Sequence, residues 1–197
     1  MTRLPVTGAF RVTATYGQTG SYWANGHQGI DLTAEDSRVF ATCYGTVRLV
    51  AFDKNGWGRY VSVGDEQGQR HIFCHLQEGS VTVKAGDAVT PLTVLGRMGA
   101  TGKATGTHLH YQLQQGETVK NPATYLGIPN KVGSYRSADY SALAFRDAAS
   151  VPQWAEKAVL EAVEQGLMLG DAEGTFRPNE PVTRAELAVV LQRLKNQ

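Results

Sequence analysis

The sequence has little of several features that mark specialised classes of protein. Its 197 residues include two cysteines, Cys43 and Cys74, which lie outside any CxxC or Cys-His spacing. This excludes a zinc knuckle and a disulfide-rich scaffold, and we expect two buried free thiols, with a single bridge as the alternative. No run of about 18 apolar residues is present, so we expect no membrane span.

The chain also lacks an excess of charge of either sign. Its 19 Lys and Arg residues nearly balance its 18 Asp and Glu residues, which leaves a formal net charge of +1. Binding to the phosphate backbone of nucleic acids normally requires a basic excess, so we expect no nucleic-acid partner. The N-terminus has neither an apolar segment nor a small-residue cleavage site, and we expect no signal peptide.

Histidine and glycine are unevenly distributed along the chain. Residues 1–144 contain all five histidines and 19 of the 22 glycines, whereas residues 145–197 contain no histidine. This predicts two domains of different architecture, over residues 1–130 and 145–197, with residues 131–144 as a linker. Part of that linker, residues 131–141, could instead form a strap.

The first domain is predicted to be an antiparallel β-sheet with long glycine-rich loops. Short β-branched and aromatic runs alternate with turn residues, and no helical periodicity is sustained before residue 150. The expected strands are residues 45–52, 59–64, 69–76 and 108–114.

Two helices are predicted in the second domain. The first begins near Trp154, with Pro152 in its first turn and Gly166 at its end. The second begins at Thr183, where Glu186 completes a capping-box pattern. The expected core residues are Trp154, Phe176 and the apolar stripe over residues 187–191. The fold class is therefore α+β multidomain, an antiparallel sheet domain followed by a small helical module.

The five histidines occur in three short segments. Alternate residues of a strand share a face and lie about 7 Å apart, so His108 and His110 can serve one metal site, one as a ligand and one beside the metal. His71 and His75 would also share a face but lie about 13 Å apart, so only one of them should belong to that site.

Two histidines and one aspartate would suit a hydrolytic zinc ion. Such zinc typically has three nitrogen or oxygen ligands and an open position for a water molecule, whose pKa then falls toward neutrality. Further imidazoles could shuttle protons and stabilise an oxyanion. A single histidine is more often a surface or core residue, and it is the three segments together that favour a zinc site.

Three motifs resemble the lysostaphin/LytM-type zinc endopeptidases, which cleave cross-links or stem peptides of bacterial peptidoglycan. They are GHQGIDL at residues 26–32, FCHL at 73–76 and TGKATGTHLHY at 101–111, in the family order HxGxD, xxHL and HLH. The resemblance covers residues 13–126 and implies a compact antiparallel β-domain of the duplicated-hybrid-motif type. Its groove would be floored by the sheet and walled by loops.

Carried over residue by residue, the resemblance assigns roles to five side chains. It implies that His27, Asp31 and His110 bind Zn²⁺, and that His75 and His108 are the catalytic histidines beside the metal. His71 has no counterpart in the family motifs. The chain departs from the family at Thr107, where proline is frequent, and at Gln112, where an acidic residue is frequent.

The C-terminal segment resembles one S-layer homology repeat, through FRD at residues 145–147, GTFRPN at 174–179 and TRAE at 183–186. The resemblance implies binding to an anionic secondary cell-wall polymer, with Arg184 as the best candidate for ligand contact. Pairing of Arg184 with Glu186 or Glu180 is the alternative. Since the family usually combines three repeats, one repeat predicts weak monovalent binding or a homotrimer.

These features together predict a zinc-dependent peptidoglycan endopeptidase that acts at the bacterial cell wall. Without a signal peptide it resembles a phage endolysin, which would pass from the host cytoplasm to the wall. A bacterial autolysin with its signal removed and a non-catalytic wall-binding or scaffold protein are the alternatives. The bond could lie in a glycine bridge, a D-Ala cross-link or a stem peptide.

Overall fold

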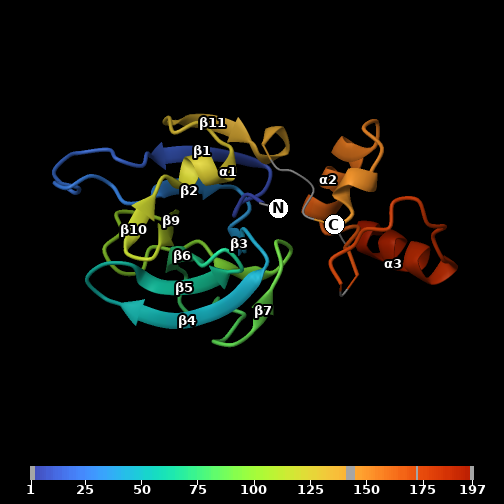
Figure 1. The fold of residues 1–197 in the computed structure, drawn as a ribbon, viewed down its shortest axis with the longest axis horizontal. Helices are drawn as coiled ribbons and strands as arrows, with labels where there is room; N and C mark the ends of the chain where they lie inside the picture. The colour runs from blue at the N-terminus through green and yellow to red at the C-terminus, as the bar shows by residue number, and fades with distance from the viewer. Residues whose placement is uncertain (1–2, 141–144, 172, 196–197) are drawn as a thin grey trace.

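A computed structural model describes residues 3–140, 145–171 and 173–195. Figure 1 shows a β-sheet body with a smaller helical module beside it. The strands are β1 (Ala9–Ala14), β2 (Ile30–Ala34), β3 (Arg38–Phe40), β4 (Gly45–Asp53), β5 (Gly58–Asp65), β6 (Gln69–Leu76), β7 (Ala88–Val89), β8 (Val94–Arg97), β9 (Leu109–Gln115), β10 (Thr118–Lys120) and β11 (Gly133–Arg136). The α-helices are α1 (Pro122–Leu126), α2 (Glu156–Glu164) and α3 (Arg184–Lys195).

The antiparallel sheet predicted from the sequence is confirmed. Nine strands form one sheet in the order β11-β1-β2-β9-β6-β5-β4-β7, with β10 paired to β9, and β3 pairs with β8 in a second small sheet. The hairpins are set by Asx-type turns, because the Asp53 carboxylate accepts the backbone N–H of Asn55 and Asp65 accepts those of Gln67 and Gln69.

One apolar cluster forms the core of the sheet domain. It contains side chains from the main sheet, from β3 and β8 and from α1, and the largest fully buried members include Tyr111, Phe73 and Leu95. Cys43 and Cys74 are buried and free, as expected. Burial raises the pKa of Cys43 to about 12, so its thiol stays protonated. No helix among the described residues is long and apolar enough to cross a bilayer.

The sheet continues past the boundary expected at residue 130. Gly133–Arg136 forms β11, which pairs with β1 at the edge of the sheet in the register Phe10↔Tyr135. Ser137 is buried, and its hydroxyl accepts the backbone N–H of Gly8. The linker predicted over residues 131–144 is therefore wrong for residues 133–137, which form the strap considered as the alternative, and residues 141–144 lie outside the described residues.

The helical module differs from its predicted packing. Its small core consists of Phe145, Val151, Leu160 and Val163, with Leu92 of the sheet domain packed against it. Trp154 is 87% exposed and α3 buries no residue, so the prediction that Trp154 and the stripe over residues 187–191 form the core is wrong. The physical reason is that Phe145, Phe176 and Leu92 fill the space beside α2 instead.

The helix ends of the module follow the sequence more closely. Gly166 takes a positive φ of 71° directly after the cap of α2, and Thr183 and Glu186 exchange the hydrogen bonds of a capping box at the start of α3. Pro152 lies in the turn before α2 rather than in its first turn, because its carbonyl oxygen accepts the N–H of Ala155, the N-cap residue.

Contacts join the module to the end of the sheet domain where β3 and β7 lie (Figure 1). The Tyr44 hydroxyl donates to the carbonyl oxygen of Gly174 over 3.4 Å, and the Arg146 guanidinium lies 5.6 Å from the centroid of the Tyr44 ring. Leu92 adds an apolar contact. The module therefore docks on the sheet domain through a small mixed interface.

His71 is a structural residue of the sheet domain. Its side chain is fully buried, its Nε2 lies 3.2 Å from Asp65 Oδ2, and its Nδ1 accepts from the Tyr111 hydroxyl over 2.7 Å. Burial lowers the pKa of His71, although Asp65 opposes the shift, so the folded protein holds this ring neutral.

We predict that His71 makes the fold acid-sensitive. In the unfolded state His71 is protonated near pH 6.5, whereas in the folded state it is protonated only at lower pH. The contribution of His71 to the free energy of unfolding is therefore complete above pH 6.5 and decreases as the pH falls below that value. His71→Gln keeps a polar group but does not titrate, and it should cost about 1–3 kcal/mol at pH 7.5. In urea unfolding between pH 4 and 8, the free energy of unfolding should decrease less toward low pH for the variant than for the wild type. Parallel pH profiles of the two proteins would contradict the prediction.

Candidate metal and catalytic site

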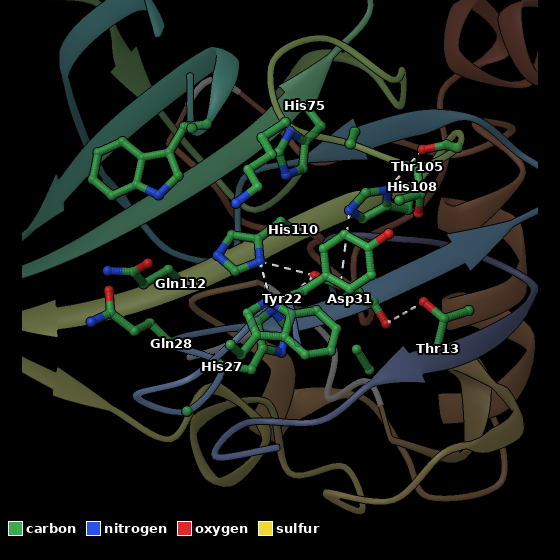
Figure 2. A pocket seen from close by; sticks show the side chains of 18 of the residues that line it. Thr13, Tyr22, His27, Gln28, Asp31, His75, Thr105, His108, His110 and Gln112 are labelled. Carbon is green, nitrogen blue, oxygen red and sulfur yellow. Dashed lines mark hydrogen bonds and ion pairs between the residues drawn. The ribbon is translucent and has the colours of Figure 1, made fainter. Parts of the chain in front are cut away.

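Antiparallel pairing of β2 with β9 brings two motif residues face to face. The register is Ile30↔Tyr111 and Asp31↔His110, so the Asp31 carboxylate and the His110 imidazole project from the same face of the sheet. His27 approaches from the loop before β2. Figure 2 shows the three side chains converging on one point of the cleft.

The three side chains lie at metal-binding separation. His110 Nδ1 lies 2.9 Å and His27 Nε2 3.2 Å from Asp31 Oδ1, and the two imidazole nitrogens are 3.0 Å apart. Among the described residues, this is the group of at least three His, Cys, Asp or Glu side chains whose ligand atoms lie close enough to hold one ion. Two nitrogens and one carboxylate oxygen form the donor set of hydrolytic zinc sites.

Hydrogen bonds around the trio orient its members. His27 Nδ1 donates to the carbonyl oxygen of Thr15 over 2.9 Å, which leaves Nε2 free to bind a cation. Gly29 has no room for a side chain, because a Cβ there would lie 2.5 Å from His110 Cε1. The glycine of the HxGxD motif is thus needed for close approach of the His110 ring.

The side chain of Asp31 is buried. Burial by itself would raise the pKa of its carboxyl, but hydrogen bonds and electrostatic interactions with His110 and His27 hold that pKa well below its usual range. The carboxylate is therefore ionised at neutral pH and suited to a divalent cation.

Two further histidines flank the trio. The His75 and His108 rings lie 4.7 Å apart, and His108 Nε2 is 3.8 Å from Asp31 Oδ2. His75 Nδ1 donates to the carbonyl oxygen of Thr101 and His108 Nδ1 to that of Gly106, each over 2.8 Å. Burial, together with the nearby His108 and His110, lowers the pKa of His75 to about 4, although the Thr101 hydrogen bond and Asp31 oppose the shift.

His75 reaches this cleft through a β-bulge. Arg59 pairs with Leu76 and Val61 with Phe73, so two residues of β6 oppose one residue of β5. His75 itself has a φ of 59°, in the left-handed region. Regular alternation would place His75 on the face of Phe73 and His71, away from His110, so the bulge turns it toward the trio.

The trio and the two flanking histidines lie in an open cleft of about 680 Å³. Its walls come from the loop before β2, the β4–β5 turn and the glycine-rich loop before β9. The cleft is also lined by Tyr22, Trp23, Trp57 and Lys103, to which the sequence motifs assign no role. Trp23 stands 4.5 Å from the His27 ring, and aromatic residues within the glycine-rich loops were the signal that could have found it.

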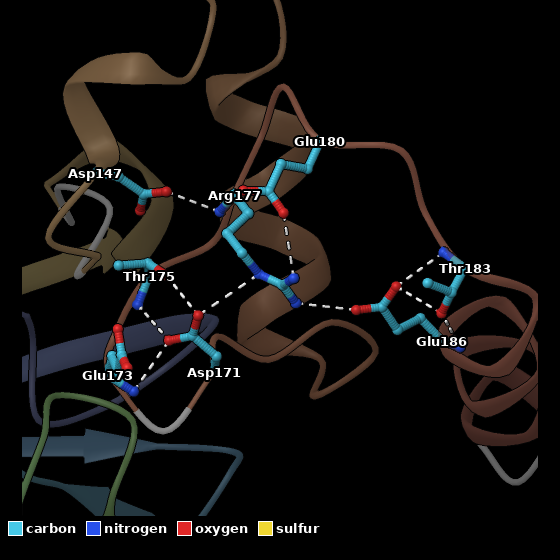
Figure 3. Close-up of polar contacts among 8 residues, drawn as sticks. All are labelled: Asp147, Asp171, Glu173, Thr175, Arg177, Glu180, Thr183 and Glu186. Atoms are coloured by element: carbon cyan, nitrogen blue, oxygen red, sulfur yellow. Dashed lines mark hydrogen bonds and ion pairs between the residues drawn. The ribbon is translucent and has the colours of Figure 1, made fainter.

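The polar residues of the C-terminal module form an internal network (Figure 3). Asp147 accepts the backbone N–H groups of Phe176 and Arg177, and the Arg177 guanidinium contacts Asp171, Glu180 and Glu186. Arg184 is exposed and forms no ion pair with the described residues. The pairing of Arg184 with Glu186 or Glu180 is therefore wrong, because Arg177 occupies both carboxylates.

Solved structures with this fold define the class of the sheet domain. A mutant catalytic domain of the prophage-encoded M23 protein EnpA from Enterococcus faecalis is 28% identical with a TM-score of 0.54, and the alignment covers 62% of this chain and 96% of that domain. The catalytic domain of lysostaphin from Staphylococcus simulans is 25% identical with a TM-score of 0.55, covering 60% and 92%. The sheet domain thus has the lysostaphin-like peptidase fold.

Family models identify both parts of the chain. Residues 25–122 match peptidase family M23, and residues 144–188 match the S-layer homology domain. The chain therefore contains a domain of peptidase family M23, whose members are zinc metallopeptidases, followed by an S-layer homology domain.

Three curated relatives match half of this chain or more. An uncharacterised metalloprotease of Haemophilus influenzae is 30% identical over 70% of this chain, an L-Ala–D-Glu endopeptidase of Bacillus subtilis 30% over 55%, and the peptidoglycan DD-endopeptidase ShyC of Vibrio cholerae 31% over 50%. The matches cover 29%, 36% and 22% of those proteins, so the chain spans about a third of their length or less.

We predict that Gly29→Ala disrupts the trio. The added methyl group would lie 2.5 Å from His110 Cε1 and 2.6 Å from the Tyr111 carbonyl oxygen, so it would displace the His110 ring and the local backbone of β9, and the zinc content after dialysis against limiting zinc should fall well below one ion per chain. Gly106→Ala is the matched control, since a Cβ at Gly106 meets open space in the same cleft. Equal zinc content in both variants, measured by atomic absorption with circular dichroism as the folding check, would contradict the prediction.

Proposed function

We propose that this protein is a zinc-dependent endopeptidase that cleaves peptide bonds in bacterial peptidoglycan and is held at the wall by its S-layer homology domain. The observation that carries the proposal is the meeting of His27, Asp31 and His110 beside His75 and His108 in one open cleft. The names of the Bacillus and Vibrio relatives support a peptidoglycan peptide as substrate. Because those names specify different bonds, both a stem bond and a cross-link remain candidates.

His27, Asp31 and His110 would hold the zinc ion. When bound there, zinc would supply a Lewis acid for the peptide carbonyl and lower the pKa of a water molecule toward neutrality. His75 is neutral at pH 7 and its Nδ1 is occupied by Thr101, so its Nε2 is the base that accepts a proton. His108 has its Nδ1 fixed by Gly106, and its Nε2 faces the site, where it can stabilise the oxyanion or pass a proton to the leaving amine.

The C-terminal module would anchor the enzyme through Arg184. An unpaired guanidinium at the start of a helix can bind carboxylate or phosphate in a bidentate manner, which suits an anionic secondary cell-wall polymer. The exposed apolar side chains Leu187, Leu191 and Leu194 on α3 support self-association, and we propose a homotrimer through this module. Three weak sites on one particle would raise the avidity for the wall.

We further propose that the enzyme acts in the manner of a phage endolysin. Its similarity to the catalytic domain of a prophage-encoded protein supports this role over that of a bacterial autolysin. Co-expression of the chain with a membrane pore in the cytoplasm of a Gram-positive host should then cause lysis.

We predict different zinc contents for two histidine variants that both lose activity. His110→Ala removes one of three zinc ligands and should lose both zinc and activity. His75→Ala should retain zinc but lose at least about a hundredfold in kcat, because general-base catalysis is typically worth this much. Zinc content and muropeptide release, followed by mass spectrometry, test both. Equal zinc loss in the two variants would show that the roles are misassigned, and zinc binding without any bond cleavage would favour the non-catalytic scaffold.

We predict that the module can be removed without loss of chemistry. A chain ending at Tyr140 keeps β11 and should cleave soluble peptides at the full-length rate, but it should sediment with purified walls far less and behave as a monomer. Arg184→Gln in the full chain should reduce wall sedimentation while the trimer persists. Unchanged wall retention in the truncated chain would contradict the anchoring role, and a monomeric full chain in analytical ultracentrifugation would contradict the trimer.

A further inference from the structure

A buried side-chain amide without a partner lies at one end of the cleft. Gln112 lines the cleft on β9 and is 1% exposed. Neither its Oε1 nor its Nε2 has a hydrogen-bond partner among the described residues. Buried amides are nearly always paired in folded proteins, because an unpaired one destabilises the folded state. We therefore expect Gln112 to form hydrogen bonds with a partner from outside the chain.

The sheet register explains why the chain itself supplies no partner. Gln112 lies opposite Ile72 of β6, whose side chain has no polar atom. Alternation along β9 places Gln112 on the same face as His108 and His110. Figure 2 shows Gln112 beside Gln28, on the side of His110 away from His108 and Thr105.

The chemistry of the amide matches that of a peptide group. Gln112 offers one acceptor and two donors, and a peptide group offers one N–H donor and one carbonyl acceptor. An incoming peptide cannot pair with the main chain of β9, because β2 and β6 flank it on both sides. In this part of the cleft floor, side-chain amides rather than the backbone of β9 can therefore form hydrogen bonds with a substrate main chain.

The spacing along β9 indicates which peptide group is bound. Gln112 follows His110 by two residues, which corresponds to about 7 Å, or two residues of an extended peptide. We propose that Gln112 is a substrate-binding residue that hydrogen-bonds the substrate main chain two residues from the scissile bond. This inference rests on the endopeptidase function proposed above and adds that the cleft selects extended peptides of sufficient length.

The test uses a variant that keeps the shape of the side chain and removes its polarity. Gln112→Met in the zinc-loaded full chain should retain zinc and unfold at the same or a higher temperature, because an unpaired amide has been removed. With a synthetic peptide that extends at least two residues on both sides of the bond mapped by muropeptide mass spectrometry, kcat/KM should fall on the order of tenfold, the loss expected from one or two hydrogen bonds. A shortened peptide that lacks the bound peptide group should show no difference between variant and wild type.

Gln114→Met is the matched control. Gln114 lies two residues further along the same face of β9 but does not line the cleft, so this change should leave kcat/KM within twofold. A second test needs only the wild-type protein. Replacing the peptide group of the substrate that Gln112 binds by an ester should lower kcat/KM about tenfold. Unchanged kcat/KM for the long peptide in Gln112→Met at any unfolding temperature, or equal rates for peptide and ester, would overturn the inference. Failure of the wild type to cleave any peptide would instead overturn the endopeptidase function, and the inference with it.

Discussion

The pairing of β2 with β9 is the constraint on which the site depends. Because side chains alternate along a strand, the register Asp31↔His110 puts a carboxylate and an imidazole on one face, and a slip of one residue would separate them. Gly29 lets the His110 ring lie against the β2 backbone, and His27 enters from the same chain segment, four residues before Asp31. Two members of the trio, Asp31 and His110, are therefore placed by sheet register, and His27 is placed by the loop before β2.

The regular part of this arrangement is readable from the sequence. Strand alternation predicts that His108 and His110 share a face, and residues 45–52 and 69–76 agree with β4 and β6 within one residue. The position of His75 is not readable in this way, because it depends on a bulge and a positive φ in a strand that looks regular. Local strain of this kind is stabilised only by the surrounding fold, here by the hydrogen bonds of His75 to Trp57 and Thr101.

The helical module shows a different limit of sequence patterns. A helical stripe predicts which face of α3 is apolar, but it does not say what covers that face. In the structure, Phe145 and Leu92 complete the core beside α2, and Leu92 comes from a loop of the peptidase domain that no periodicity connects to the module. The stripe of α3 remains exposed in the single chain. Helix existence and capping follow from local sequence, whereas the packing partner is a property of the whole fold.

Several features are unfavourable among the described residues, including the unpartnered Gln69 Oε1 and the positive φ of Arg177, and the locations of three others are informative. His75 holds a strained backbone conformation, Gln112 buries an unpaired amide, and α3 exposes Leu187, Leu191 and Leu194. Natural sequences tend to break local rules at functional sites and to be stabilised elsewhere. The first two features lie in the cleft and the third on the module, while the sheet core and the His71 network are well satisfied. The stable part of the fold thus supports two surfaces that need something from outside the chain, one at the cleft and one at α3.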